Sequence, residues 1–343
     1  MIIHLKPKEF LEASHIPVVD VRSPGEFEQG HIPGAINVPL FDNAERAVVG
    51  TLYKKSGPEA ALLKGLDISG PKMTDFVKQG WRHAVNHEVR MHCWRGGKRS
   101  DSMAWLFSTA GIKVHLLRGG YKTYRRYIRE RLEADICYFV LSGRTGTGKT
   151  EILRELKKTG QQVLDLEGIA HHKGSAFGAI GELPQPTNEQ FENDVFQHWS
   201  AMDFDQPIWL EDESRAIGRV SIPEPLFVRM RSCTVIEVDM PAELRVQRLV
   251  KDYAAFPEKM LIDSVERISR RLGGQHAQAA VKAIESGDFE TAIGIVLRYY
   301  DKTYSYGLHK RSSENIHTIT TSTTDAAENA RMVADYCISQ KLI

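Results

Sequence analysis

A cysteine is followed by a glycine-rich, basic segment in His92-Cys-Trp-Arg-Gly-Gly-Lys-Arg-Ser100. The pattern predicts a strand that ends at Cys93, a helix that starts near Lys98, and two glycines, Gly96 and Gly97, that let the backbone amides point inward. Such amides, a helix N-terminus and nearby positive charge hold an anion and favour the reactive thiolate. Cys93 is therefore predicted to be a nucleophile. The residues expected to hold the anion are Arg95, Gly96, Gly97, Lys98 and Arg99.

A second loop, Gly143-Arg-Thr-Gly-Thr-Gly-Lys-Thr150, matches the pattern G-x-x-x-x-G-K-[ST] between a predicted strand and a predicted helix. This is the setting of a P-loop, whose amides surround a diphosphate. Lys149 would neutralise the diphosphate and Thr150 would be placed for Mg²⁺. The motif indicates a diphosphate without specifying ATP. The predicted diphosphate-binding residues are Gly143, Thr145, Gly146, Gly148, Lys149 and Thr150.

Acidic residues end the predicted strand in Ile208-Trp-Leu-Glu-Asp-Glu213. Glu211 or Asp212 could support a metal ion at the P-loop, and an ordinary solvated strand end explains the same residues equally well. Mg²⁺ at the P-loop is the one ion that the sequence suggests. No cofactor is expected to be tightly bound, and no metal site is predicted with certainty.

Seven Lys or Arg residues stand against one acid between Lys113 and Arg131, and tyrosines interleave with them. Such a strip could face RNA, with tyrosines stacking on bases and arginines on phosphates. A helix between domains, with its tyrosines packed inward, explains the pattern slightly better from the residues alone. The candidate RNA-contacting residues are Tyr121, Lys122, Arg125 and Arg126.

The length of 343 residues suggests two domains, and 42% hydrophobic residues suffice for two cores. Short apolar runs alternate with helical patterns, which predicts an α/β fold with two parallel sheets, the second of them carrying the P-loop, each with helices on both faces. The domains are expected at 1–133 and 134–343, with a less regular insertion around 42–86. The expected strands are Ile16–Val21, Ala35–Val38, Val89–Cys93, Lys113–Leu117, Ile136–Leu141, Gln162–Leu166, Pro207–Glu211 and Thr234–Val238, and the helices are Lys98–Ala110, Tyr121–Leu132, Lys149–Lys158, Asn188–Met202, Pro241–Ala255 and Asp325–Gln340.

Composition limits the other classes of function. The net charge of +1 neither demands nor excludes a nucleic-acid partner. The four cysteines form no C-x-x-C pair, which argues against a zinc site or a disulfide framework and suits a reducing compartment. No apolar run approaches the roughly 18 residues of a membrane span, and Met1–Phe10 does not resemble a signal peptide. A cytoplasmic protein without a membrane partner is expected.

The segment Asp20–Asn37 and the stretch Leu117-Arg-Gly-Gly120 resemble the opening and closing motifs of the rhodanese family. Arg99 lies six residues past Cys93, whereas single-domain rhodaneses usually place the loop arginine five past their cysteine. The loop therefore also matches the His-Cys-x5-Arg-Ser signature of cysteine phosphatases. A longer loop suits a tetrahedral oxyanion, so the substrate at Cys93 is expected to be phosphate-like.

The whole chain resembles the tRNA 2-selenouridine synthase family. The segments that carry this resemblance are Asn43–Lys54, Asp165–Gly178 and Leu210–Gly218, which are not generic rhodanese or P-loop patterns. The resemblance implies two steps on 2-thiouridine at the tRNA wobble position: S-geranylation from geranyl diphosphate, then replacement of the S-geranyl group by selenium from selenophosphate. It also implies that Cys93 carries the selenium as selanyl-cysteine and that Gly65 belongs to a segment tied to geranylation.

Two other enzymes remain as alternatives: a cysteine phosphatase of rhodanese fold joined to a kinase-like P-loop domain, and a sulfurtransferase that delivers sulfur instead of selenium. A non-catalytic binding module is a third alternative, in which Cys93→Ser has no effect. A complete loop around the cysteine disfavours this last reading.

Overall fold

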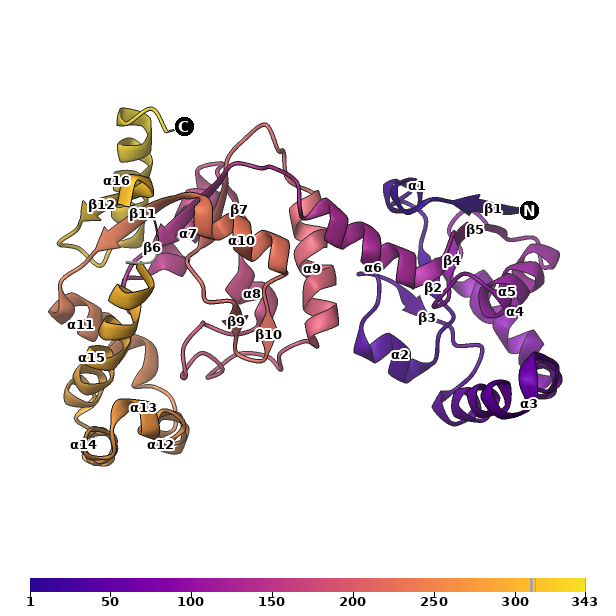
Figure 1. The fold of residues 1–343 in the computed structure, drawn as a ribbon, viewed down its shortest axis with the longest axis horizontal. Coiled ribbons are helices and arrows are strands. Elements are labelled where there is room, and N and C mark those ends of the chain that lie inside the picture. Colours follow the sequence, from indigo (N-terminus) through magenta and orange to yellow (C-terminus); the bar gives the residue numbers. More distant parts are fainter. Residues whose placement is uncertain (309–310, 312, 343) are drawn as a thin grey trace. The chain divides into compact units, whose positions relative to one another are not determined.

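The computed structural model describes residues 1–308, 311 and 313–342 (Figure 1). Contacts within the chain divide it into two compact units, Met1–Leu132 and Glu133–Ile343. Each unit contains a five-stranded parallel sheet accompanied by helices, which confirms the expected α/β class. In the described ranges, every helix is too short or too polar to span a bilayer.

The sheet of the first unit has the strand order β1-β5-β4-β2-β3. Its central strands are apolar and buried, as expected for a parallel sheet covered by helices. β4 lies between β2 and β5, since Asp20 of β2 pairs with His92 of β4 and Met91 of β4 pairs with Leu116 of β5. The chain that follows His92 therefore leaves the sheet at its carboxyl edge, with a neighbouring strand on each side. Ligands of parallel sheets bind at this edge. The strands are β1 (Ile2–Leu5), β2 (Val18–Asp20), β3 (Ile36–Asn37), β4 (Glu88–His92) and β5 (Lys113–Leu117).

Helices supply the remaining core of the first unit. Phe41, Phe76 and Phe107 are buried together with the valines and Met91 of the central strands. The helices are α1 (Pro7–Glu12), α2 (Pro24–Gln29), α3 (Asn43–Ser69), the short 3₁₀ helix η1 (Gly70–Lys72), α4 (Met73–His83), α5 (Lys98–Thr109) and α6 (Gly120–Arg131).

The segment around 42–86, which we expected to be less regular, is largely helical, since α3 and α4 occupy most of it. Two features hide the helical pattern in the sequence. Gly57 has a φ of +89° and precedes Pro58, so α3 is broken at this point. Leu63 and Leu66 are 66% and 57% exposed, so apolar residues do not mark a single buried face.

The sheet of the second unit has the order β12-β11-β6-β8-β7, with β6 at its centre. Leu141 near the end of β6 pairs with Glu211 at the end of β8, which brings this acid to the segment that follows β6. The strands are β6 (Tyr138–Ser142), β7 (Gln162–Val163), β8 (Ile208–Glu211), β11 (Thr234–Asp239) and β12 (Ile316–Thr320), and a separate antiparallel hairpin pairs β9 (Ala216–Ile217) with β10 (Val220–Ser221).

Helices occupy most of the rest of this unit. The predicted strand Gln162–Leu166 is shorter than expected, because Leu166 already begins a helix that Asp165 caps through the Gly168 amide. The helices are α7 (Lys149–Lys158), α8 (Leu166–Ala170), α9 (Asn188–Ser200), α10 (Glu224–Ser232), α11 (Ala242–Tyr253), α12 (Glu258–Arg267), α13 (Ser269–Leu272), α14 (Gly274–Glu285), α15 (Phe289–Leu308), the 3₁₀ helix η2 (Ser313–Asn315) and α16 (Ala326–Ser339).

Candidate functional site

Cys93 follows β4 directly, and the loop after it ends where α5 begins at Lys98. The Cys93 side chain is 3% exposed, and its sulfur accepts a hydrogen bond from the Gly97 amide with an N···S distance of 3.4 Å. The Ser100 hydroxyl lies 3.2 Å from the same sulfur. These contacts fix the sulfur at the base of the loop. The sequence analysis did not single out Ser100, which stands in the first turn of α5.

The loop backbone has the properties of an anion site. Tyr121 and Lys122 at the start of α6 donate their amides to the carbonyl oxygens of Cys93 and Trp94, each at 2.9 Å. The loop is thus held by its carbonyls, while its amides stay available for a ligand. The loop amides that make no hydrogen bond to any residue the structure describes include those of Arg95, Gly96, Lys98 and Arg99.

Two glycines allow this close approach between the loop and α6. Gly96 has a φ of +61°, and a Cβ there would lie 2.9 Å from the Gly119 nitrogen. Gly120 also has a φ of +61°, and a Cβ there would collide with the Cys93 carbonyl oxygen. The close contact between the cysteine loop and the start of α6 therefore requires glycine at position 120, the last residue of the stretch that resembles the rhodanese closing motif.

Arg99 is paired with a carboxylate instead of lying over the loop amides. Its Nη1 donates to Glu26 Oε2 at 2.6 Å, and Arg46 Nε lies 3.5 Å from the same oxygen. Burial acts to raise the pKa of Glu26, but the hydrogen bond and charge of Arg99, together with the charge of Arg46, lower it overall. Of the basic side chains predicted to hold an anion, Arg95 and Lys98 are exposed, and Arg99 is engaged by Glu26.

A buried ion pair next to the loop was not predicted from the sequence. Arg22 Nη2 lies 2.6 Å from Asp20 Oδ2, and neither side chain is exposed. The Arg22 guanidinium also lies 3.9 Å from the ring centroid of Tyr121, the residue whose amide holds Cys93. Burial acts to raise the pKa of Asp20, but the charges of His92 and Arg22 lower it overall. The pair thus supports the loop from within the first unit.

The predicted tRNA-contacting residues separate into two groups. Tyr121 and Arg125 are buried, and the Tyr121 ring packs on His92 and Arg22, so this tyrosine is not placed to stack on a base. Lys122 and Arg126 are exposed. The helical period explains the split, because each residue of the exposed pair is turned about 100° around α6 from the buried residue before it.

Gly65 lies in α3 of the first unit and is buried. A Cβ at this position would lie 3.3 Å from the Phe41 ring, so Gly65 allows α3 to pack closely on the core. The structure thus shows a packing role for this residue within the first unit.

The predicted P-loop joins β6 to α7 in the second unit. Gly146 and Gly148 have φ values of +88° and +84°, which favour glycine, and a Cβ on Gly148 would lie 2.9 Å from the Arg248 guanidinium carbon. Loop amides without a protein partner are available to a diphosphate. Among those with no hydrogen bond to any described residue are the amides of Gly146, Gly148, Lys149 and Thr150.

Lys149 spans the loop. Its Nζ donates to the Gly143 carbonyl oxygen at 3.2 Å and lies 3.4 Å from Glu211 Oε1. Burial acts to lower the pKa of Lys149, but nearby carboxylates, Glu211 foremost, raise it overall. The side chain therefore stays charged and is positioned beside the loop amides.

Thr150 connects the P-loop to a cluster of three carboxyl groups. Its hydroxyl donates to Glu167 Oε2 and to Glu211 Oε2, each at 3.0 Å. Oxygen atoms of Glu167, Glu211 and Glu213 all lie within 4.8 Å of one another. Gly174 borders the cluster, because a Cβ there would lie 2.7 Å from both carboxylate oxygens of Glu213.

The electrostatics of this cluster favour a bound cation. Burial and mutual repulsion raise the pKa of Glu167 to about 10 and that of Glu213 to about 8, and burial raises the pKa of Glu211 as well. Three buried carboxyl groups this close must take up protons or share a metal ion. Carboxylate and hydroxyl oxygens beside a P-loop are the donors that Mg²⁺ prefers. The residues present therefore fit Mg²⁺.

Asp212 does not join the cluster. Its carboxylate accepts a hydrogen bond from Ser142 Oγ at 2.6 Å and pairs with Arg311. Alternation along the strand explains this result, since residues 211 and 213 face one side and residue 212 faces the other. The same alternation could have identified Glu213 from the sequence as a further acid of the site. Glu167 lies on α8, and only the fold brings it to the site.

Two known families match successive parts of the chain. Residues 6–127 match the family described as rhodanese-like domain, and residues 136–333 match the tRNA 2-selenouridine synthase AAA domain.

Three relatives, each called tRNA 2-selenouridine synthase, are similar over most of the chain. The protein of Bdellovibrio bacteriovorus is 41% identical and aligns with 73% of this chain and 68% of its own length. The protein of Nitrosomonas europaea is 33% identical, with 86% of this chain and 90% of its own covered. The protein of Bordetella petrii is 37% identical, with 87% and 88% covered. The chain belongs to the tRNA 2-selenouridine synthase family.

Proposed function

We propose that the chain converts 2-thiouridine at the wobble position of tRNA to 2-selenouridine, with geranyl diphosphate and selenophosphate as co-substrates. The shared name of the relatives supports the overall reaction. The observation that carries the proposal is the presence, in one chain, of a cysteine loop and a P-loop that each present unbonded amides to an anion. Each loop suits one of the two anionic co-substrates.

The first step takes place at the P-loop. The 2-sulfur of the uridine attacks C1 of the geranyl group, a C–S bond forms, and the C1–O bond breaks with its electron pair leaving on the diphosphate. Lys149 and the amides of Gly148 and Thr150 stabilise the charge that develops on this leaving group. Their positions before the reaction are fixed by the fold, so they need no reorganisation when the charge appears.

The carboxyl cluster supports this step. Glu167, Glu211 and Glu213, with Thr150, would hold Mg²⁺, which supplies positive charge to the leaving diphosphate when bound. Glu211 also lies beside Lys149 and keeps its ammonium group charged and oriented.

The second step takes place at the Cys93 loop. Selenophosphate is a tetrahedral oxyanion, and the amides of Arg95, Gly96 and Lys98 suit its oxygens. The Cys93 thiolate attacks C2 of the uridine, the C2–S bond breaks, and the geranyl group departs as geranylthiol, a better leaving group than sulfide. The selenium of selenophosphate then displaces Cys93 from C2, and water cleaves the Se–P bond, which releases phosphate and leaves 2-selenouridine. Exposed Lys122 and Arg126 on α6 are assigned to the tRNA backbone.

The pairing of Arg99 with Glu26 favours this reading over a cysteine phosphatase. A phosphatase of the Cys-x5-Arg type needs its arginine to contact the phosphoester, and here the guanidinium is held by a carboxylate at 2.6 Å.

The proposal is tested by incubating the protein with 2-thiouridine tRNA, geranyl diphosphate, selenophosphate and Mg²⁺, and analysing the nucleosides by mass spectrometry. S-geranyl-2-thiouridine should appear without selenophosphate, and 2-selenouridine when it is added. If neither nucleoside forms, the proposal is wrong. Parallel reactions with thiosulfate and with a phosphoester test the sulfurtransferase and phosphatase activities, and Cys137→Ser serves as a control because Cys137 is an exposed cysteine outside both loops.

A further inference from the structure

A helical lobe interrupts the sheet of the second unit. β11 and β12 are neighbouring parallel strands, and the chain between them forms α11 to α15. These helices and the loop before α9 share an apolar cluster that includes Ile180, Val265, Ile284 and Ala292 and is separate from the core beneath the sheet. A crossover between adjacent strands requires only one helix, so the lobe exceeds what the fold needs.

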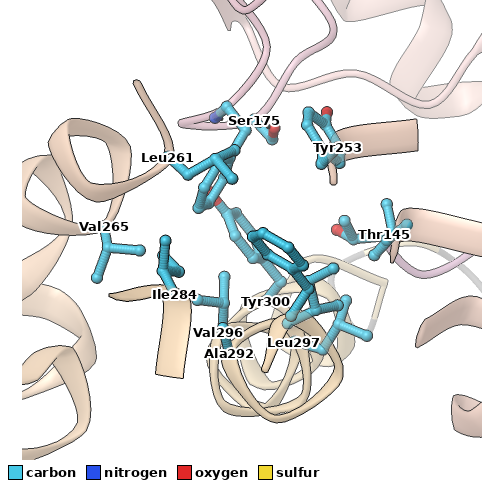
Figure 2. Close-up of a pocket in the computed structure, with 14 residues that line it drawn as sticks. Thr145, Ser175, Tyr253, Leu261, Val265, Ile284, Ala292, Val296, Leu297 and Tyr300 are labelled. Carbon is cyan, nitrogen blue, oxygen red and sulfur yellow. Dashed lines mark hydrogen bonds between the residues drawn. The ribbon is translucent and has the colours of Figure 1, made fainter. Parts of the chain in front are cut away.

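The lobe contains a partly open pocket (Figure 2). Aliphatic and aromatic side chains form most of its wall. Thr145 of the P-loop lines the same pocket, so the pocket opens where a bound diphosphate would lie. Figure 2 shows Thr145 on one side of the pocket and Val265 and Ile284 on the opposite side.

Two polar groups of the wall are engaged within the second unit. The Tyr300 hydroxyl accepts a hydrogen bond from the Ala176 amide at 2.9 Å. The Ser175 hydroxyl accepts a hydrogen bond from the Phe177 amide at 3.2 Å. A purine base and its ribose need hydrogen-bonding partners when buried, whereas a hydrocarbon needs none. The wall therefore suits an apolar tail better than a nucleoside.

We infer that this pocket binds the isoprenoid chain of an allylic diphosphate, with the diphosphate on the P-loop and the chain end near Val265 and Ile284. The inference rests on the proposed function and adds to it the site that selects chain length. Each buried CH₂ group is worth about 0.8 kcal/mol, or roughly a fourfold change in affinity. Geranyl diphosphate should therefore bind at least about a hundredfold more tightly than dimethylallyl diphosphate, which is one isoprene unit shorter.

The wall offers variants that change the pocket in opposite directions. Ile284→Ala lengthens the space at the end opposite Thr145 and should raise the affinity for farnesyl diphosphate relative to geranyl diphosphate by about tenfold. Val265→Trp fills the same end and should weaken geranyl diphosphate by about tenfold or more while leaving inorganic diphosphate unchanged. Ile268→Ala is the matched control, since Ile268 is buried in the same cluster but does not line the pocket.

The test is calorimetric titration of the full chain, without tRNA, with inorganic, dimethylallyl, geranyl and farnesyl diphosphates and with ATP. The inference holds if affinity rises from inorganic to geranyl diphosphate and the two pocket variants shift chain preference while Ile268→Ala does not. Equal affinity for all the diphosphates, tighter binding of ATP, or unchanged preference in both variants would overturn it. Failure of the proposed function is distinct, because it is seen as the absence of modified nucleosides from the wild-type reaction.

Discussion

At the scale of single residues, the carboxyl cluster gives the P-loop a measurable pH dependence. In the folded protein the pKa of Glu167 is about 10 and that of Glu213 about 8, against about 4.5 for an unperturbed glutamate. The folded state therefore holds protons that the unfolded chain releases above about pH 4.5. The contribution of these groups to the free energy of unfolding is full below that pH and is lost as the pH rises toward 8 and then 10.

Mg²⁺ should replace these protons, so its stabilising effect should grow with pH. Thermal denaturation should show saturating Mg²⁺ raising the midpoint of the second unit by about 5 °C at pH 8.5 and by less than about 2 °C at pH 6. Glu213→Gln should lose most of this response and should be more stable than wild type at pH 8.5 without Mg²⁺. Glu243→Gln, which removes an exposed acid on α11, is the control. An equal response at both pH values would refute the metal assignment.

Some residues of the P-loop site could be predicted from the sequence, and others could not. Lys149 and Thr150 could be predicted because a continuous motif carries them. Glu211 could be proposed because it ends a strand, but the choice between it and Asp212 depended on which face of the strand each occupies. Glu167 could not be found, because it enters the site from α8 and nothing near it in the sequence indicates a ligand.

At the scale of secondary-structure elements, one buried arginine joins the P-loop to two helices of the lobe. Arg245 of α11 donates to the Thr145 carbonyl oxygen at 3.1 Å and forms two hydrogen bonds of 2.9 Å with Asp301 of α15. The Arg245 side chain is 2% exposed, and that of Asp301 is 30% exposed. The loop, α11 and α15 should therefore move and unfold together.

Breaking this contact should destabilise the second unit. Asp301→Asn leaves the buried Arg245 charge without its partner and should cost about 3 kcal/mol, seen as a fall of roughly 6–12 °C in the unfolding midpoint. Glu155→Gln breaks the more exposed ion pair with Lys158 in the same unit and should cost less than about 1 kcal/mol. If Asp301→Asn and Glu155→Gln have equal unfolding midpoints, the ion pair between Asp301 and Arg245 does not stabilise the second unit as expected.

The elements themselves were predictable where their patterns were regular. β5 and α7 have the bounds expected from sequence, since each is a continuous run between clear start and stop signals. The helical lobe was largely missed. In α14 the buried face is made mostly of alanines, which weaken the contrast between buried and exposed faces. β12 was missed because its threonines and His317 lie partly exposed at the sheet edge.

At the scale of the whole molecule, each unit is proposed to carry out one chemical step: selenium transfer in the first unit and geranylation in the second. The first unit, Met1–Leu132, holds the Cys93 loop, and the second unit, Glu133–Ile343, holds the P-loop, the carboxyl cluster and the apolar pocket. In the proposed function, the S-geranyl nucleoside is the product of the second unit and the substrate of the first. The two steps should therefore be separable by single substitutions.

The central claim is tested most directly by presenting Lys149→Ala and Cys93→Ala proteins with two tRNAs, one carrying 2-thiouridine and one already carrying S-geranyl-2-thiouridine. Lys149→Ala should geranylate the first tRNA at least about a hundredfold more slowly than wild type, yet convert the second to 2-selenouridine at nearly the wild-type rate. Cys93→Ala should do the reverse, geranylating normally and forming no 2-selenouridine. Wild-type selenium incorporation by Cys93→Ala, or loss of both steps in each folded variant, would contradict the account.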